Sequence, residues 1–376
     1  MRIVVNTRFW MSGQLEGYGY FTEQVFTRIA RANPAHQFLF LFDRKPPSLG
    51  ALPGNVEVKV VGPQARHPWL WKWWYDWRIP SVLSRFRADL FVSPDGIASL
   101  RTKVPQCLVV HDLAFLQDPE WFPRPIRTYY RKHTPRFLRQ VNRIATVSEL
   151  SKQEIMDRYA ISADKIGVVY SAAKPDFHPL TDEECSSVKA RFTEGKEFFL
   201  CTGAIHPRKN LIGLLKAFSL FKKRQQTGFK LVLAGRLAWR SGDFEKLLSA
   251  YKYRSDVVLT GYVDLNTLVE LTAAAYAMVY PSFYEGFGVP VLEAMQSDVP
   301  VVTSAGTSMQ EIAGPAALYA DPKEPASIAE QMNRLYVDES LRRRLIEQGR
   351  DVARRFDWEE TARRLWTDMQ AAAQSD

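Results

Sequence analysis

Two glutamates eight positions apart, Glu285 and Glu293, enclose the segment of this chain best suited to chemistry. Gly286 and Gly288 permit backbone angles and close ligand approaches that a Cβ would forbid. Pro290 is typical of the first position of a helix, so we expect a loop that ends there and a helix that continues through Glu293. The residue before the proline is a poor helix cap, which leaves first-turn N–H groups available for an anion. Carboxylates suit sugar hydroxyls and a helix start suits phosphate, so the segment favours a nucleotide-sugar. The alternative is a plain helix start, with a glutamate favoured by the macrodipole.

A second segment, Gly203–Asn210, carries adjacent cations between an expected strand and an expected helix. Arg208 and Lys209 in a loop beside a helix start predict a phosphate site. Asn210 is a favourable residue for the cap of that helix. The sequence has no Gly-Lys-Ser/Thr run, so this is not a P-loop. A basic surface turn is the alternative interpretation.

Two further segments lie next to expected strands. His111 and Asp112 end a buried apolar run and would point off the strand tip, unless His111 is a core histidine bonded to backbone. Gly17 and Gly19 stand after the first expected strand and before a helix, where they would let a ligand approach the backbone. Residue 22 is Thr, so the dinucleotide-binding glycine fingerprint is absent, and a plain turn is the alternative.

Five tryptophans fall within nine residues, mixed with lysine and arginine. They are Trp69, Trp71, Trp73, Trp74 and Trp77. Tryptophan combined with basic residues suits a membrane interface. Helical spacing favours Trp73, Trp74 and Trp77 as a stripe that faces the core, which would leave Trp69 and Trp71 to contact lipid or an acceptor.

Composition indicates a soluble globular protein. The chain has 376 residues, 46% hydrophobic and 24% charged, which suits two or three domains. No apolar stretch reaches membrane-spanning length, and the N-terminus is typical of a strand and not of a signal peptide. Three widely spaced cysteines fit a reducing compartment, with no disulfide framework or metal spacing. We therefore expect a cytoplasmic protein.

The net charge of +9 is concentrated in the N-terminal half. Residues 61–143 contain 14 Lys/Arg and 6 Asp/Glu, a local excess of 14 − 6 = +8. Nucleic acid or an anionic membrane surface could use this charge. A solvated, soluble surface is the alternative.

Apolar β-rich runs alternate with helical patterns along the whole chain, which predicts an α/β fold of two Rossmann-like, doubly wound domains. The first series of expected strands covers Arg2–Asn6, Gln37–Asp43, Val56–Val61, Ala88–Pro94, Gln106–Asp112, Arg143–Ser148 and Ile166–Ala172. The second covers Glu197–Gly203, Phe229–Gly235, Asp256–Val263, Ala277–Phe283, Pro300–Ala305 and Ala317–Asp321. The expected domains are 1–173, joined by a C-terminal helix over 357–376, and 196–356. Residues 174–195 would form the hinge between them, and ligands would bind in a cleft at the carboxyl ends of the strands.

With these motifs in this order, the chain resembles the retaining glycosyltransferases of family 4 (group 1), which have the GT-B fold. The resemblance covers essentially the whole length, and its most specific mark is Glu285 to Glu293. The segments Pro207–Asn210, His111–Leu113 and Thr146–Ser151 follow in specificity. Ala204 departs from the family pattern, since many relatives carry a cation there.

The resemblance implies roles by position. Arg208 and Lys209 would hold the diphosphate, Glu285 would contact the donor sugar, and His111 would sit beside that sugar; these four would form the catalytic set. Glu293 would bind the ribose and backbone near Val263 the base, in an N-terminal acceptor-binding and C-terminal donor-binding arrangement. The implied donor-binding residues are Gly17, Gly19, Gly203, Val263, Gly286, Phe287, Gly288, Val289 and Glu293.

The resemblance implies metal-independent transfer of a hexose with retention, and mannose is favoured. The donor would be GDP-mannose, with UDP- or ADP-sugars as alternatives, and no cofactor is expected. The acceptor would be a glycan or lipid-linked glycan in surface polysaccharide or glycolipid assembly. We expect loose contact with an anionic membrane at the inner face of the cytoplasmic membrane, and no nucleic acid. The alternatives are a sugar-nucleotide epimerase or hydrolase on the same fold, and a non-catalytic protein that binds membrane or nucleic acid.

Overall fold

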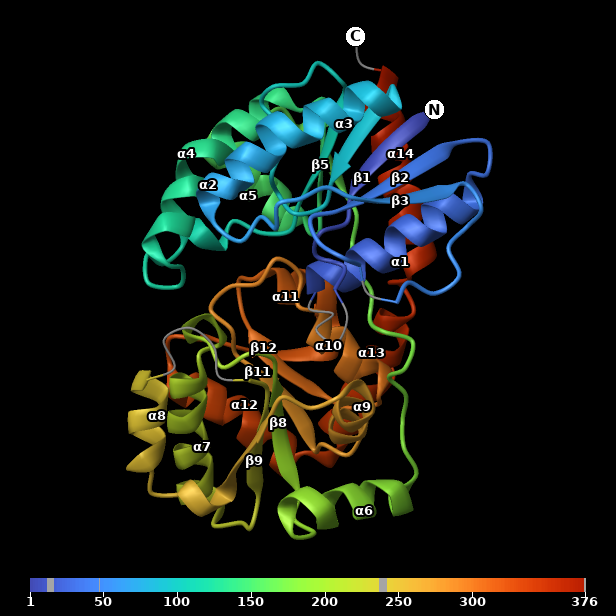
Figure 1. The fold of residues 1–376 in the computed structure, drawn as a ribbon. Helices are drawn as coiled ribbons and strands as arrows, with labels where there is room; N and C mark the ends of the chain where they lie inside the picture. The colour runs from blue at the N-terminus through green and yellow to red at the C-terminus, as the bar shows by residue number, and fades with distance from the viewer. Residues whose placement is uncertain (12–16, 47, 237–241, 375–376) are drawn as a thin grey trace. The chain divides into compact units, whose positions relative to one another are not determined.

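A computed structural model describes residues 1–11, 17–46, 48–236 and 242–374 (Figure 1). The chain divides into two compact units. Unit 1 contains Met1–Ser171 and Asp357–Asp376, and unit 2 contains Ala172–Phe356. The first division lies two residues before the end of the expected N-terminal domain, and the last helix belongs to unit 1.

Unit 1 is built on a seven-stranded sheet in the order β3-β2-β1-β4-β5-β6-β7, in which every neighbouring pair is parallel. Its strands are β1 (Arg2–Asn6), β2 (Gln37–Phe42), β3 (Val56–Val60), β4 (Leu90–Ser93), β5 (Gln106–Val110), β6 (Arg143–Thr146) and β7 (Ile166–Val168). Strands β1, β2, β4 and β5 are almost entirely buried because helices cover both faces of the sheet.

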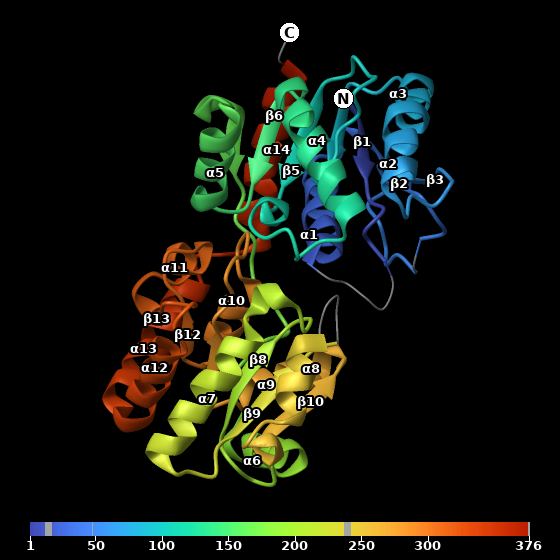
Figure 2. The same cartoon turned by 90° about the vertical axis from the view of Figure 1, so that its left-hand side faces the viewer.

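One face of this sheet is covered by α1 (Gly17–Ala32) and α14 (Trp358–Gln374), which pack against each other (Figure 2). The other face carries the remaining helices of the unit. They are α2 (Pro68–Trp73), α3 (Ile79–Phe86), α4 (Arg124–Gln140) and α5 (Glu149–Tyr159). Helix α14 is tied to the unit by the Arg143–Asp368 ion pair at 2.7 Å and by a hydrogen bond from the Thr361 hydroxyl to the Tyr170 carbonyl.

Unit 2 is built on a six-stranded parallel sheet in the order β10-β9-β8-β11-β12-β13. Its strands are β8 (Phe198–Thr202), β9 (Lys230–Ala234), β10 (Val257–Gly261), β11 (Ala277–Tyr280), β12 (Val301–Ser304) and β13 (Ala317–Ala320). Its helices are α6 (Asp182–Thr193), α7 (Leu211–Gln225), α8 (Gly242–Ser249), α9 (Leu265–Ala273), α10 (Val289–Gln296), α11 (Ser308–Ala313), α12 (Pro325–Val337) and α13 (Glu339–Ala353). Both units are therefore doubly wound α/β structures, as the sequence predicts.

The thirteen expected strands are all present, most of them shorter by a few residues at their ends. Two expectations about the extent of loops differ from the structure. The polar segment expected as a hinge contains the helix α6, which a capping box between Thr181 and Glu184 starts. Gly17 and Gly19 lie in the first turn of α1 and not in a loop before it.

The predicted assignment of tryptophans to the core and to the surface is wrong. Trp71 and Trp74 are buried, whereas Trp69, Trp73 and Trp77 are exposed. The indole N–H groups of the buried pair donate to the carbonyls of Ala65 and Val61, at 2.8 and 2.6 Å. Trp71 and Trp74, three residues apart, share the buried side of the helix, so Trp69 and Trp73 face outward. A π-helical turn over Trp74–Arg78 follows α2 directly and widens the helix at that point. Trp77 is thereby turned away from the core.

Candidate functional site

The loops that follow β8 and β11 meet at the topological switch point of unit 2. These two strands are neighbours, while the connections from them lead to opposite edges of the sheet. In open parallel sheets, ligands bind outside the carboxyl ends of the strands at such a point. The first loop carries Arg208 and Lys209, and the second carries Glu285. The two segments singled out in the sequence therefore lie together.

Glu285 forms ion pairs with both cations of the neighbouring loop. Its Oε2 atom lies 2.9 Å from Nη1 of Arg208, and its Oε1 atom lies 2.7 Å from Nζ of Lys209. Lys209 also donates a hydrogen bond to the hydroxyl of Tyr280. Lys209 and Glu285 are both buried, and Arg208 is partly exposed. The result is a desolvated cluster with two positive charges and one negative charge, which a diphosphate could neutralise.

Burial opposes ionisation of Glu285, but the adjacent charges of Arg208 and Lys209 outweigh it and lower its pKa to about 2. Burial also lowers the pKa of Lys209, and the carboxylate of Glu285 works against that decrease. A carboxylate with so low a pKa accepts hydrogen bonds throughout the physiological pH range. It is therefore suited to bind hydroxyl groups.

Hydrogen bonds to backbone carbonyls hold the loop after β8 against the loop after β11. The amide of Phe283 donates to the carbonyl of Arg208 at 2.9 Å. The side-chain amide of Asn210 donates to the carbonyls of Pro281 and Pro322, at 3.1 and 2.6 Å. Asn210 occupies the N-cap position of α7, but its side chain makes no capping hydrogen bond. Its predicted role as a cap is thus replaced by a role in joining the loops.

The glycine-containing turn after Glu285 ends at α10, which begins at Val289 with Pro290 in its first turn. This confirms the predicted loop and helix. Gly288 has φ of +102°, and a Cβ there would lie 2.6 Å from Cγ of Met309, so only glycine fits. The hydroxyl of Ser308 donates to the carbonyl of Glu285 at 2.7 Å, which anchors the turn from the other side. Gly286, Phe287 and Gly288 are buried beside this contact.

Glu293 is the fifth residue of α10 and is only 6% exposed. Its carboxyl group makes no hydrogen bond or ion pair with any residue that the structure describes. Burial raises its pKa to about 7, although Lys174 and Lys209 act in the opposite direction. An acceptor without a partner at a switch point is ready for a hydroxyl-bearing ligand.

The remaining predicted residues of unit 2 lie at the same edge of the sheet. Gly203 follows β8 with φ of +103°, and a Cβ there would lie 3.4 Å from Cε of Lys209. Val263 lies in the partly exposed turn between β10 and α9. The predicted residues of unit 2 thus follow β8, β10 and β11.

His111, Gly17 and Gly19 belong to unit 1. Nε2 of His111 lies 3.0 Å from the carbonyl of Pro94, and because a carbonyl only accepts, this nitrogen carries the proton. Tyr18 and Phe21 of α1 pack edge-on against the imidazole, with ring centroids at 4.5 and 4.8 Å. Burial lowers the pKa of His111 to about 4, so the ring is neutral and Nδ1 keeps its lone pair. The role that the family resemblance implies for His111 stays a prediction.

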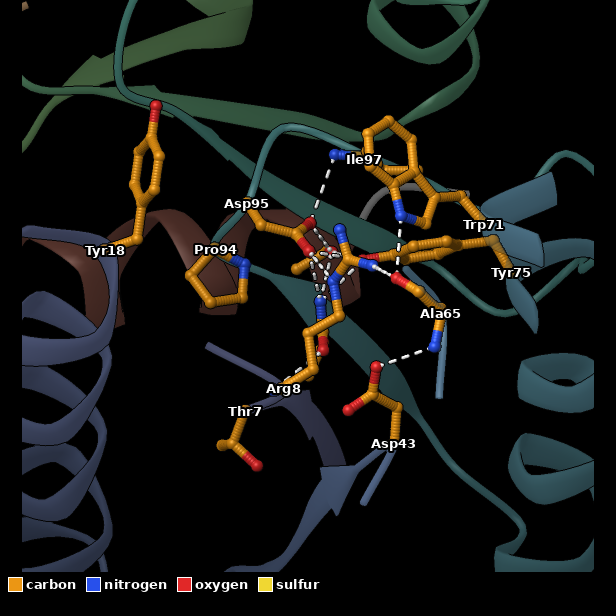
Figure 3. A network of polar contacts seen from close by, with 12 residues as sticks. Thr7, Arg8, Tyr18, Asp43, Ala65, Trp71, Tyr75, Pro94, Asp95 and Ile97 are labelled. Carbon is orange, nitrogen blue, oxygen red and sulfur yellow. Dashed lines mark hydrogen bonds and ion pairs between the residues drawn. The ribbon is translucent and has the colours of Figure 1, made fainter. Parts of the chain in front are cut away.

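A buried polar network that the sequence analysis does not predict lies at the switch point of unit 1, between β1 and β4 (Figure 3). Nε of Arg8 lies 2.6 Å from Oδ2 of Asp95. The same oxygen accepts hydrogen bonds from Asn6 at 2.9 Å and from the hydroxyl of Tyr75 at 2.6 Å. The signal in the sequence that could have found this network is a charged residue just after each of two expected strands, Arg8 and Asp95. Tyr75 comes from the tryptophan-rich segment. The network fixes the carboxyl ends of both strands.

Comparisons with known proteins place this architecture. Two doubly wound α/β units are the architecture of the GT-B class, and solved glycosyltransferase structures share this fold. The family model described as "Glycosyltransferase Family 4" matches residues 22–177 of this chain. The family model described as "Glycosyl transferases group 1" matches residues 182–352. The chain belongs to this family of glycosyltransferases.

Individual relatives agree with this assignment. O-antigen chain mannosyltransferase B of Escherichia coli is 34% identical over 250 residues, which cover 66% of each chain. The serotype-specific mannosyltransferase WbdA of Escherichia coli is 29% identical over 267 residues, which cover 68% of this chain and 32% of that protein. The chain thus spans about two thirds of one relative and one third of the other. The crystal structure of Anabaena HepE with UDP and glucose has the same fold, with a TM-score of 0.74, 19% identity, and coverage of 99% of this chain and 100% of that one.

No helix among the described residues is both long enough and apolar enough to cross a membrane.

Proposed function

We propose that this protein transfers mannose from a nucleotide-diphosphate sugar to a glycan or lipid-linked acceptor. The observation that carries the proposal is the buried cluster of Arg208, Lys209 and Glu285 at the switch point of unit 2. The preference for mannose rests on the mannosyltransferases among the relatives. GDP-mannose is the favoured donor, and UDP- and ADP-sugars are the alternatives.

The bond to be broken joins the anomeric carbon of the sugar to the diphosphate, so the leaving group gains negative charge. Arg208 and Lys209 would bind that charge, together with the N–H groups at the start of α10. Donor binding would exchange partners in the cluster: the diphosphate takes the two cations, and sugar hydroxyls take the carboxylate of Glu285. Glu293 would accept hydrogen bonds from the ribose. Because two protein cations stabilise the leaving group, we propose that the reaction requires no metal ion.

We further propose that transfer proceeds with retention, by attack on the face of the sugar that the leaving group occupies. The acceptor hydroxyl would lose its proton to the departing phosphate. Glu285 would not act as a covalent nucleophile, since its carboxylate is engaged by two cations and reserved for hydroxyl groups.

The test is turnover with GDP-mannose, UDP-glucose and ADP-glucose, each with and without a mannose-terminated acceptor. We expect an α-linked mannosyl product from GDP-mannose, with its anomeric configuration read by NMR. A β-linked product would contradict retention. Rapid epimerised or hydrolysed sugar from the donor alone would instead support an epimerase or a hydrolase. Donor binding also raises thermal stability, and at equal ligand concentration it does so more for a tighter ligand, which ranks the three nucleotides independently of any acceptor.

A further inference from the structure

The edge strand β3 of unit 1 is exposed along most of its length. It ends the sheet, and β2 is its one partner among the described strands (Figure 2). Its sequence is Val-Glu-Val-Lys-Val, and every residue except the half-buried Val56 is exposed. The other edge strands, β7, β10 and β13, each begin with a buried residue and are buried or half-buried along most of their length. An uncovered edge strand is a ready template for another strand.

The register with β2 determines which backbone groups of β3 point outward. The amide of Phe38 in β2 donates to the carbonyl of Asn55 at 2.9 Å, just before β3 begins. The amide of Val61, just after β3 ends, donates to the carbonyl of Phe42 at 2.7 Å. Residues that bond to a neighbouring strand alternate along the chain, so residues 57 and 59 also direct their backbone groups toward β2. The three valines of β3 therefore direct theirs outward.

Most of these outward groups have no hydrogen-bond partner among the described residues. The amide of Val56 is the exception, because it donates to the carbonyl of Pro53 at 3.0 Å and closes the turn before the strand. The N–H and C=O of Val58, the C=O of Val56 and the N–H of Val60 remain available. Val58 and Val60 are also 39% and 50% exposed.

The side chains of β3 are complementary to those of the same strand in reverse. Side chains alternate along a strand, so the valines lie on one face of the sheet and Glu57 and Lys59 on the other. A second β3 strand can lie antiparallel along the open edge with Val58 opposite Val58. Val56 then lies opposite Val60 of the second copy, and Glu57 lies opposite Lys59. Valines meet on one face and opposite charges meet on the other.

We propose that this open edge is the interface of a homodimer, in which two β3 strands pair antiparallel about a two-fold axis at Val58. The N–H of Val58 would donate to the C=O of Val58 in the second copy, and the N–H of Val60 to the C=O of Val56. Each bond is made twice by the symmetry, and the two sheets become one. The proposal goes beyond the transfer reaction and does not depend on it.

The charges on β3 favour a second copy over another partner. Charged side chains on an edge strand commonly prevent pairing. Glu57 and Lys59 have opposite signs and lie on either side of Val58, so each faces its opposite when the same strand is reversed. A strand from an unrelated protein would need the same order of charges to match. Because a pair of five-residue strands makes a small interface, we expect monomer and dimer to exchange at micromolar concentrations.

Exchanging the charges tests the pairing. Sedimentation velocity of the full chain up to about 100 μM, in about 150 mM salt, should show dimers that increase with concentration. Glu57→Lys and Lys59→Glu, made separately, each place like charges opposite one another and should weaken association by about tenfold or more. An equal mixture of the two variants should recover dimers, because opposite charges then face each other again. Glu347→Lys, which makes the same change at an exposed position of α13, is the matched control.

Cysteine cross-linking tests the register. Val58→Cys places two thiols at a hydrogen-bonded antiparallel pair, whose Cα atoms lie about 5.5 Å apart and within reach of a disulfide. Copper phenanthroline should therefore cross-link this variant. Val60→Cys places its two thiols more than about 13 Å apart along the strands and should not cross-link. The unaltered chain, with its own three cysteines, is the control for background.

A proline variant separates the outward edge from the fold. Val58→Pro removes an N–H that points away from β2, so circular dichroism and thermal stability should show that unit 1 still folds while the dimer is lost. A chain that stays monomeric at every concentration would overturn the proposal. Dimers that neither Val58→Pro nor the single charge variants weaken, or equal cross-linking of the two cysteine variants, would overturn it as well.

Discussion

Glu293 makes the stability of unit 2 depend on pH in a defined direction. Its pKa in the folded protein is raised from the ordinary value of 4.5 to about 7. Between these two values the folded state holds a proton that the unfolded state has released. The free energy of unfolding is therefore highest below the unfolded pKa and falls as the pH rises toward 7. One pKa unit corresponds to about 1.4 kcal/mol, so the full effect is about 3 kcal/mol.

Glu293→Gln removes the titration while it keeps the shape of the side chain. The amide adds an offset that is independent of pH, so the informative quantity is the difference in unfolding free energy between the two proteins. We expect that difference to change by about 2.5 kcal/mol between about pH 5 and pH 8, in favour of the variant at the higher pH. Urea unfolding followed by circular dichroism measures it. Glu347→Gln, which removes an exposed carboxyl of α13, is the control for the change in charge.

The same experiment with ligand connects stability to binding. Ribose hydroxyls that hydrogen-bond to the carboxylate would favour its ionised form, so GDP should release a proton when it binds near pH 7. Calorimetry in two buffers of different ionisation enthalpy measures that release, and the variant should show none. A free-energy difference that stays constant within about 1 kcal/mol over the pH range would refute the reasoning, because it would mean that Glu293 is not buried without a partner.

Three further predictions concern the charged cluster and the reaction. Lys209→Ala should lower turnover by on the order of 100-fold, because one cation of the leaving-group site is lost; turnover equal to that of the unaltered enzyme would remove Lys209 from the phosphate site. Glu285→Gln should bind GDP more tightly, by about tenfold, while sugar transfer falls, because Arg208 and Lys209 lose the carboxylate that competes with the diphosphate. Calorimetry measures that affinity, and weaker binding would contradict the exchange of partners. Transfer should continue in EDTA at its full rate, and complete loss of product there would show that a metal ion takes part.

The strands could be predicted because their signal is local. Continuous apolar runs such as Phe38–Phe42 are buried on both faces of a parallel sheet, and the polar residues after them mark where the strand ends. The turn after Glu285 could be predicted for the same reason, since Gly288 and Pro290 each specify a local backbone conformation.

Other features depend on contacts between distant residues. Nothing near Glu285 in the sequence indicates that its carboxylate pairs with Arg208 and Lys209, more than seventy residues earlier. The prediction for the tryptophans is wrong because Trp71, and not Trp73, shares the buried side of α2 with Trp74, and because the π-helical turn moves Trp77 away from the regular spacing of 3.6 residues. The network around Arg8 and Asp95 forms only when β1 and β4 become neighbours in the sheet.

The return of the last helix to unit 1 has a consequence for protein engineering. The backbone passes from one unit to the other twice, after Ser171 and after Phe356, and both chain ends belong to unit 1. A fragment that stops at Ser171 would lack α14 and leave part of its sheet uncovered. Unit 2, in contrast, is one uninterrupted segment. A chimera that exchanges unit 2 between relatives therefore requires two junctions, and unit 2 can be replaced as one continuous segment.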